Sequence, residues 1–287
     1  MKRSFLATVI LFSSMAHGTT RNIYDLMYLP KANTNFGMTE LNSHSGRIKF
    51  AHYKRTEIYG NSIAQTLGRS FTDQFSASAN LYYADVSYYN NGNSRTKVVG
   101  VSDPVFNLKF RAMEGDYLLD ILGGALYSRG SQHTRMNGDQ NNLTGGPQLF
   151  AGLQLGKNLE RLQWSLLAQV KRQFRTTDRN ESSDDKTKYD ERDSHLFQGD
   201  LLGIINEKSF IRTFLSLTFR EAYYDNSTPP SRTSPNTRYI AGAEYQHLCK
   251  ENLLMRLGVN YDKINTNAGV VNDYHYWTFR LAANYQF

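Results

Sequence analysis

Cysteine, proline and long apolar runs are all scarce in this chain of 287 residues. The single cysteine, Cys249, excludes an internal disulfide framework. The scarcity of proline, with only 6 residues, favours β structure, because proline cannot donate a hydrogen bond to a sheet ladder. After residue 18 no apolar run reaches about 18 residues, so the sequence predicts no membrane-spanning helix.

The mean hydropathy of −0.55 is typical of a soluble protein, but it does not exclude a membrane barrel. About half of the residues in each barrel strand are polar, and they dilute the average. Aromatic residues make up 13% of the chain, and their rings suit both strands and the boundary between water and lipid. Two β architectures therefore stay open, a soluble sandwich and an outer-membrane barrel.

Residues 1–18 have the pattern of a secretory signal peptide. Lys2 and Arg3 precede a largely apolar run over residues 5–12, and the segment ends with the small residues of Ala16-His17-Gly18. The run is well short of the roughly 20 residues that a spanning helix needs, which favours a cleaved signal over an anchor. Loss of Lys2 and Arg3 with this segment lowers the net charge from +7 to +5, since 31 basic and 26 acidic residues then remain. For an exported chain this charge suits anionic lipopolysaccharide or an anionic solute, and nucleic acid is not an expected partner.

The stretch WTFRLAANYQF, residues 277–287, alternates between two kinds of side chain. One set is apolar or aromatic and the other is mostly polar, which is typical of a β-strand with two unlike faces. In a soluble sandwich the apolar face forms the core, whereas in an outer-membrane barrel it faces lipid.

The same period of two recurs along the chain and predicts twelve strands, with ten or fourteen also compatible. The segment GRIKFAHYKRT, residues 46–56, alternates as well and fits either of the first two strands. The expected strands span residues 33–44, 58–71, 73–89, 100–113, 117–128, 144–157, 162–175, 195–206, 210–224, 238–249, 253–263 and 273–287.

The connections between these strands alternate in length. EGD, NLER, EKS and KEN are short, whereas NNGNSRTK, RGSQHTRMNGDQNN, DRNESSDDKTKYDERD, DNSTPPSRTSPNT and NTNAGVVN are long and polar. Bacterial outer-membrane barrels have short periplasmic turns and long extracellular loops, and a soluble sandwich has no reason for this sorting. We therefore expect an all-β, closed antiparallel transmembrane β-barrel over residues 33–287, in the bacterial outer membrane.

The alternation assigns one face of each strand to lipid and the other to the lumen. The expected lipid-facing residues are Phe75, Leu81, Phe110, Trp164, Leu217, Trp277, Phe279, Leu281, Tyr285 and Phe287. The expected lumen-lining residues are Lys109, Arg111, Asp120, Lys171, Arg175, Asp200, Arg212, Arg220, Glu244, Arg256 and Arg280, together with Arg238 and Asp262.

The excess of basic over acidic residues in the lumen favours a passive channel for small solutes, with a preference for anions. The alternative is a filled, non-conducting barrel with a structural or surface-interaction role. In it the arginines pair with the acids and with Gln148, Gln154, Gln163 and Gln169. Residues 19–32 are expected either to plug the lumen or to form a periplasmic tail.

Two short motifs stand out in the first half of the chain, a G-x-x-x-T-D turn at residues 68–73 and a G-x-x-D-P motif at residues 100–104, before LKFR. They resemble motifs of the MetA-pathway of phenol degradation family of outer-membrane transporters. The resemblance covers some 60 residues and implies a barrel with a transport role and no catalytic residues. The aromatic final residue with alternating apolar residues before it resembles the signal that the barrel-assembly machinery reads, which implies that machinery as a partner.

No enzyme, cofactor or metal site is expected. His133, His195, His247 and His275 are scattered, and none lies in a recognisable nucleophile setting. The loop at residues 178–193 is rich in carboxylates but lacks the D-x-D-x-D-G order of a calcium loop. We expect it to be a solvated extracellular loop.

Overall fold

A computed structural model describes residues 22–50, 56–90, 94–128, 132–134, 140–143, 146–180, 185–222, 235–266 and 271–287. The expected signal peptide, residues 1–18, lies outside these ranges. Within them the protein is all-β. No helix of the described residues is long and apolar enough to span a membrane.

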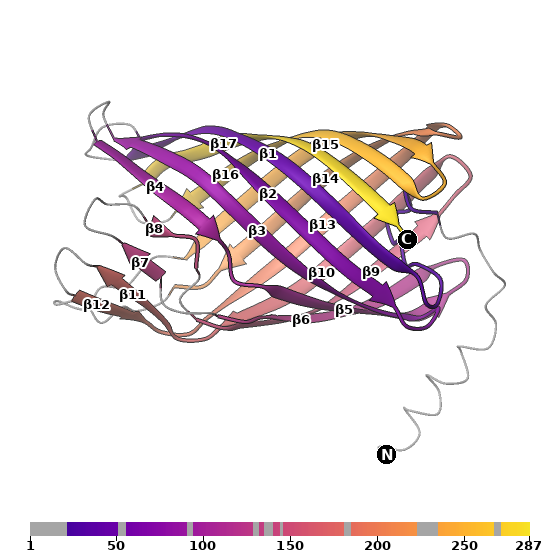
Figure 1. The fold of residues 1–287 in the computed structure, drawn as a ribbon, viewed down its shortest axis with the longest axis horizontal. Helices are drawn as coiled ribbons and strands as arrows, with labels where there is room; N and C mark the ends of the chain where they lie inside the picture. Colours follow the sequence, from indigo (N-terminus) through magenta and orange to yellow (C-terminus); the bar gives the residue numbers. More distant parts are fainter. Residues whose placement is uncertain are drawn as a thin grey trace, which may run out of the picture.

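The strands form one continuous sheet that closes on itself (Figure 1). Their bounds are β1 Asn35–Phe50, β2 Thr56–Ser70, β3 Phe75–Asn90, β4 Ser94–Val101, β5 Val105–Glu114, β6 Leu118–Leu126, β7 Gln132–Thr134, β8 Gln140–Asn141, β9 Gln148–Asn158, β10 Leu162–Gln173, β11 Thr176–Asn180, β12 Asp185–Tyr189, β13 Arg192–Asn206, β14 Ser209–Arg220, β15 Asn236–Lys250, β16 Leu253–Thr266 and β17 Val271–Gln286.

Twelve antiparallel strands make the barrel wall, which confirms the expected fold class. β4 and β5 together form one of them, because both pair with β3, at its two ends. Pairing of β1 with β17 closes the barrel in an unbroken register from Phe36 opposite Gln286 to Lys49 opposite Asp273. Two further backbone hydrogen bonds join Asn35 and Phe287, at 3.0 and 3.2 Å.

The two faces of the wall differ in chemistry as the alternation requires. Large apolar side chains cover the outside, with Leu257, Leu166 and Phe279 respectively 62%, 58% and 57% exposed. The inner side holds buried polar and charged groups, such as Asp120 and Glu244. A wall that is oily outside and polar inside is the arrangement of a barrel surrounded by lipid.

The wall strand formed by β4 and β5 is interrupted at residues 102–104, where the sequence predicts the start of a strand. Gly100 has a φ of +125°, a backbone conformation that residues with a Cβ rarely adopt. Pro104 has no N–H to donate, although its carbonyl accepts a hydrogen bond from the Tyr127 N–H at 3.0 Å. The expectation that residues 94–97 are loop is wrong. They belong to β4, which pairs with β3 on the long-loop side of the interruption.

The two ends of the barrel differ, as Figure 1 shows. Short turns at residues 115–117, 159–161, 207–208 and 251–252 occupy the end near Phe287. The long connections occupy the opposite end and contain strands that the sequence did not predict: β7 and β8 in one, β11 and β12 in another. Residues 46–50 of the ambiguous GRIKFAHYKRT segment belong to β1.

Arginine in place of Leu257 should lower the free energy of unfolding by about 2–4 kcal/mol, because it puts a charge into the lipid near the middle of the wall. Leu257 pairs with Tyr245 of β15 and Leu281 of β17 on the outer side. Urea titration of protein refolded into lipid vesicles measures the change. The control Glu251→Arg adds the same side chain in a turn and should change stability by about 0.5 kcal/mol or less. Equal losses would contradict a lipid-facing Leu257.

Candidate functional site: the barrel interior

Glu244 is the centre of a buried ion network on the inner side of the wall. Arg256 of β16 lies with Nε 2.8 Å from Glu244 Oε1 and Nη2 3.0 Å from Oε2. Arg280 of β17 donates to Glu244 Oε2 at 2.8 Å and contacts Glu40 of β1 at 3.3 Å. Arg212 of β14 approaches Glu244 to 4.0 Å. Glu244 therefore ties together side chains of five neighbouring wall strands.

Asp200 and Asp262 each hold an arginine in the same way. Arg212 Nε lies 2.9 Å from Asp200 Oδ1. Arg238 Nε lies 2.8 Å from Asp262 Oδ2, and Arg238 Nη2 also donates to Tyr276 Oη at 2.7 Å. In these pairs the charge of the arginine is matched by a buried carboxylate.

Asp120 is fully buried and pairs with two cations of the adjacent strand β5. Lys109 Nζ lies 2.8 Å from Asp120 Oδ2, and Arg111 Nε donates to Asp120 Oδ1. Both cations also bind backbone carbonyls of the N-terminal segment: Lys109 donates to Tyr28 O at 3.0 Å, and Arg111 donates to Met27 O. The Asp120 cluster thus connects the wall to the segment before β1.

The segment before β1, residues 22–34, packs against the inner side of the barrel at the short-turn end. The Leu26 N–H donates to Gln163 Oε1 at 3.0 Å, and Gln163 Nε2 donates to Asp25 Oδ1 at 2.7 Å. A Cβ at Gly156 would collide with the Met27 sulfur, so this glycine makes room for the segment.

Apolar contacts and turn contacts also hold the segment. Ile23 packs in a buried cluster with Leu202, Phe210 and Leu254, and the Tyr24 ring stacks on Phe210 with centroids 3.9 Å apart. Further along, Ser70 Oγ donates to Pro30 O at 2.8 Å, and the Ala32 N–H donates to Asp73 Oδ1 at 2.9 Å. Asp73 belongs to the G-x-x-x-T-D motif, so that turn anchors the segment.

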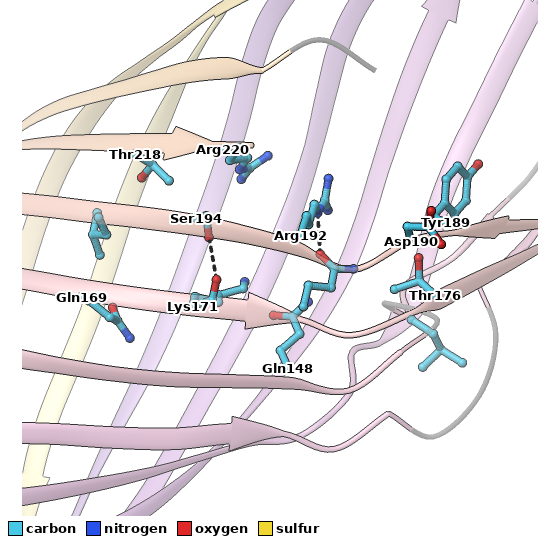
Figure 2. A pocket seen from close by; sticks show the side chains of 13 residues that line it. Gln148, Gln169, Lys171, Thr176, Tyr189, Asp190, Arg192, Ser194, Thr218 and Arg220 are labelled. Atoms are coloured by element: carbon cyan, nitrogen blue, oxygen red, sulfur yellow. Dashed lines mark hydrogen bonds between the residues drawn. The ribbon is translucent and has the colours of Figure 1, made fainter. Parts of the chain in front are cut away.

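A cavity of about 630 Å³ lies at the opposite, long-loop end of the interior (Figure 2). Its lining residues are Leu143, Gln148, Gln169, Lys171, Gln173, Thr176, Tyr189, Asp190, Arg192, Ser194, Leu196, Thr218 and Arg220. A second cavity of about 290 Å³ lies beside Tyr28 and Lys109, and Gln169 lines both. The two cavities therefore adjoin between the long-loop end and the N-terminal segment.

The residues expected to face lipid lie on the outer face of the wall, and those expected to line the lumen lie on the inner face, with one exception. Arg175 lies between β10 and β11, with its side chain 80% exposed and 3.8 Å from Asp190, rather than on the inner side of a wall strand. Sequence reasoning missed Arg192, because the strand containing it was expected to begin at His195. It also missed Glu40 and Asp25, because no periodic pattern predicts that Glu40 lies near Arg280 or Asp25 near Arg111.

The histidines form no catalytic arrangement in the described part of the chain. His44 hydrogen-bonds Ser62 at 2.9 Å and Thr278 at 3.1 Å, and neither of these described partners is a carboxylate. His247 lies 3.4 Å from Ser209, again without a described acid. No group of three or more His, Cys, Asp or Glu side chains among the described residues is arranged to hold a metal ion.

Carboxylates at the edge of the acidic loop contact arginines. Glu191 accepts from Arg172 at 2.8 Å, and Asp193 lies 3.9 Å from the same side chain. Residues 181–184 of this loop, which include Glu181 and Asp184, lie outside the described residues.

The sequence matches no protein-family model, and it matches no curated protein. Solved structures do match. An outer-membrane channel of Pseudomonas putida F1 aligns with a TM-score of 0.69 at 14% identity, covering 95% of this chain and all of that one. The translocator domain of the autotransporter NalP from Neisseria meningitidis aligns with a TM-score of 0.54 at 11% identity, covering 100% and 96%. The chain folds as a bacterial outer-membrane β-barrel.

The two matched barrels are described as a channel and as a translocator domain, so at these identities the likeness establishes the fold alone. Function has to be argued from the interior of this barrel, its charges, its cavities and its N-terminal segment.

Replacing Glu244 with glutamine should destabilise the barrel by about 3–5 kcal/mol, because it leaves buried arginine charges without their counter-charge. Urea unfolding in lipid vesicles measures the loss. Glu191→Gln is the matched control, since it breaks a pair in which the Glu191 and Arg172 side chains are 42% and 54% exposed. Exposed pairs contribute little, so the control should be near neutral. A Glu244 variant as stable as this control would contradict the network's structural role.

Docking of the N-terminal segment should weaken as pH rises. Burial raises the pKa of the Asp25 carboxyl, although hydrogen bonds from Gln163 and Asn22 and the nearby Arg111 oppose the shift. The carboxyl is protonated in both states below its free pKa of about 3.9, and ionisation disfavours docking as pH passes from there through the docked pKa. A spin label at Asn22→Cys in a Cys249→Ser background reports docking as the immobile fraction.

That immobile fraction should fall from pH 3.5 to pH 7 in the otherwise unchanged protein. With Asp25→Asn added, the fall should be absent, since asparagine does not ionise in this range. An equal pH dependence in both proteins would assign the effect to other groups.

Proposed function

We propose that this barrel is a passive channel for small solutes across the bacterial outer membrane, with a preference for anions. The observation that carries the proposal is the pair of adjoining cavities inside a closed wall, about 630 and 290 Å³, which share Gln169. They offer a route from the polar cavity at the long-loop end to the N-terminal segment. A filled barrel would need no such space.

The preference for anions is supported by the sign of the charges that line the wider cavity. Among the described lining residues, Lys171, Arg192 and Arg220 are cations and Asp190 is the one acid. A narrow passage with an excess of one sign focuses the field and raises the local concentration of ions of the other sign.

Residues 22–32 act in this proposal as a constriction at the periplasmic end. Support comes from their hydrogen bonds to Gln163, Lys109 and Arg111, and from the packing of Ile23 and Tyr24 among wall side chains. The segment is held by several independent contacts, and a loose periplasmic tail would have none of them.

The second candidate is a non-conducting barrel with a filled lumen. Its support is the ion network around Glu244 and Asp120, which crosses between strands and meets the N-terminal segment. We favour the channel because the ion pairs around Glu244 and Asp120 lie toward the short turns, whereas the wider cavity lies at the long-loop end.

Kinship with the MetA-pathway of phenol degradation transporters is part of the proposal. It is supported by the structural roles of the two motifs, one anchoring the N-terminal segment through Asp73 and the other interrupting the wall after Gly100. The proposed partners are outer-membrane lipid, lipopolysaccharide, the barrel-assembly machinery and small solutes. No catalytic activity is proposed.

Reconstituted in a planar bilayer under a KCl gradient, the full chain should conduct with a reversal potential of the sign set by chloride. A variant lacking residues 19–32 should conduct more per channel, because the constriction is gone, and should keep that sign. A potassium-signed potential would overturn the anion preference, and absence of conductance from both proteins would favour the filled barrel. Equal conductance of the two proteins would contradict the role of residues 22–32 as a constriction.

A further inference from the structure

The wide cavity at the long-loop end contains cations that lack the partners found elsewhere in the barrel. Lys171 and Arg220 line it, and neither has an ion pair with any other described residue. Its acid, Asp190, lies 3.8 Å from Arg175, with both side chains mostly exposed. The positive charge inside the cavity is thus not cancelled by its own lining.

Six other inward cations are each matched by a carboxylate. Lys109 and Arg111 pair with Asp120, Arg212 with Asp200, Arg238 with Asp262, and Arg256 and Arg280 with Glu244. Leaving cations partly buried without counter-charges costs free energy, so the difference between the two groups calls for an anion from outside the chain.

The neutral part of the lining indicates what else such an anion carries. Gln148, Gln169, Thr176, Ser194 and Thr218 offer amides and hydroxyls, which both donate and accept hydrogen bonds. Of the lining residues that the structure describes, Leu143 and Leu196 are the apolar ones and Tyr189 has the one aromatic ring. This surface suits a ligand with several hydroxyl groups and offers little to a hydrocarbon chain.

The geometry places the charged groups on neighbouring strands. Lys171 of β10 is directly opposite Ser194 of β13, which in turn is opposite Arg220 of β14. Arg192 is also on β13, and its Nε donates to Gln173 Oε1 at 2.8 Å, which fixes the direction of its guanidinium (Figure 2). Cations on three adjacent strands can converge on one anionic group, and a cavity of about 630 Å³ is within the usual range for small-molecule sites.

We propose that this cavity is a binding site for small polyhydroxylated organic anions, which bear a carboxylate or phosphate group held by Lys171 and Arg220 and hydroxyls held by the amide and hydroxyl side chains. The site rests on the proposed channel function, for which it names the class of solute. It acts as an extracellular-side station that solutes occupy before they pass Gln169.

Isothermal titration of the folded protein in detergent micelles tests the site without requiring conduction. Gluconate should bind saturably, and neutral glucose and hexanoate, which lacks hydroxyls, should bind much more weakly. Glucose 6-phosphate distinguishes the two anionic groups: binding of both anions supports a general anionic site, and binding of one assigns the site to that group. If neither anion binds, or glucose or hexanoate binds as well as gluconate, the proposal is overturned.

Lys171→Gln with Arg220→Gln should weaken the binding of the anion by about tenfold or more, since two charge-assisted hydrogen bonds are lost. Arg172→Gln is the matched control, because this neighbouring residue of β10 is exposed on the outer side and pairs with Glu191. It should bind as the unchanged protein does. The conservative pair Lys171→Arg with Arg220→Lys keeps both charges and should retain most of the affinity.

Gel mobility with and without boiling establishes that each variant is folded. Equal weakening in the Arg172→Gln control, or none in the double variant, would overturn the site. Conductance separates this failure from that of the channel: a barrel that conducts without selective anion binding keeps the channel and loses the site. A barrel that binds gluconate but never conducts keeps the site and loses the channel.

Discussion

Backbone N–H and C=O groups that face lipid must find partners within the protein, because hydrocarbon offers none. This constraint explains why the first and last strands of the wall are joined in an unbroken ladder from Phe36 to Lys49. It also limits where the wall can be irregular. The wall tolerates the interruption after Gly100 because β3 runs past it without a break. β3 pairs with β4 on the long-loop side and with β5 on the short-turn side.

Closure of the wall creates an interior with two regions. They differ in whether the cationic side chains are paired with carboxylates. Toward the short turns, carboxylates neutralise the arginines and the N-terminal segment fills space between them. Toward the long loops, Lys171 and Arg220 line an open cavity and have no such partners within the described ranges. The barrel thus combines a cross-linked region, which resists deformation, with a region whose charge is available to a solute. The same residue type, arginine, serves both purposes according to its neighbours.

Much of the wall could be predicted from the sequence, because the direction of a side chain on a strand is a local property that alternation exposes. The expected fold class and twelve strands were correct. The start of β4 was missed, since Ser94 to Lys97 are polar and resemble loop. Pairing between Glu244 and its arginines could not be predicted, because these residues lie on different strands. Which of them meet depends on the register between the strands, and the alternation within one strand does not reveal it. The position of residues 22–34 could not be predicted either, because they follow no period.

The ladder between β1 and β17 also has a consequence for how the chain reaches its folded state. Thr39 and Tyr285, whose hydroxyls meet across this seam, are separated by 246 positions. Contacts so distant along the chain form slowly, and until they form both outermost strands expose unpaired edges that can aggregate. Pairing of β1 with β17 is therefore the folding step that an assembly factor would accelerate most.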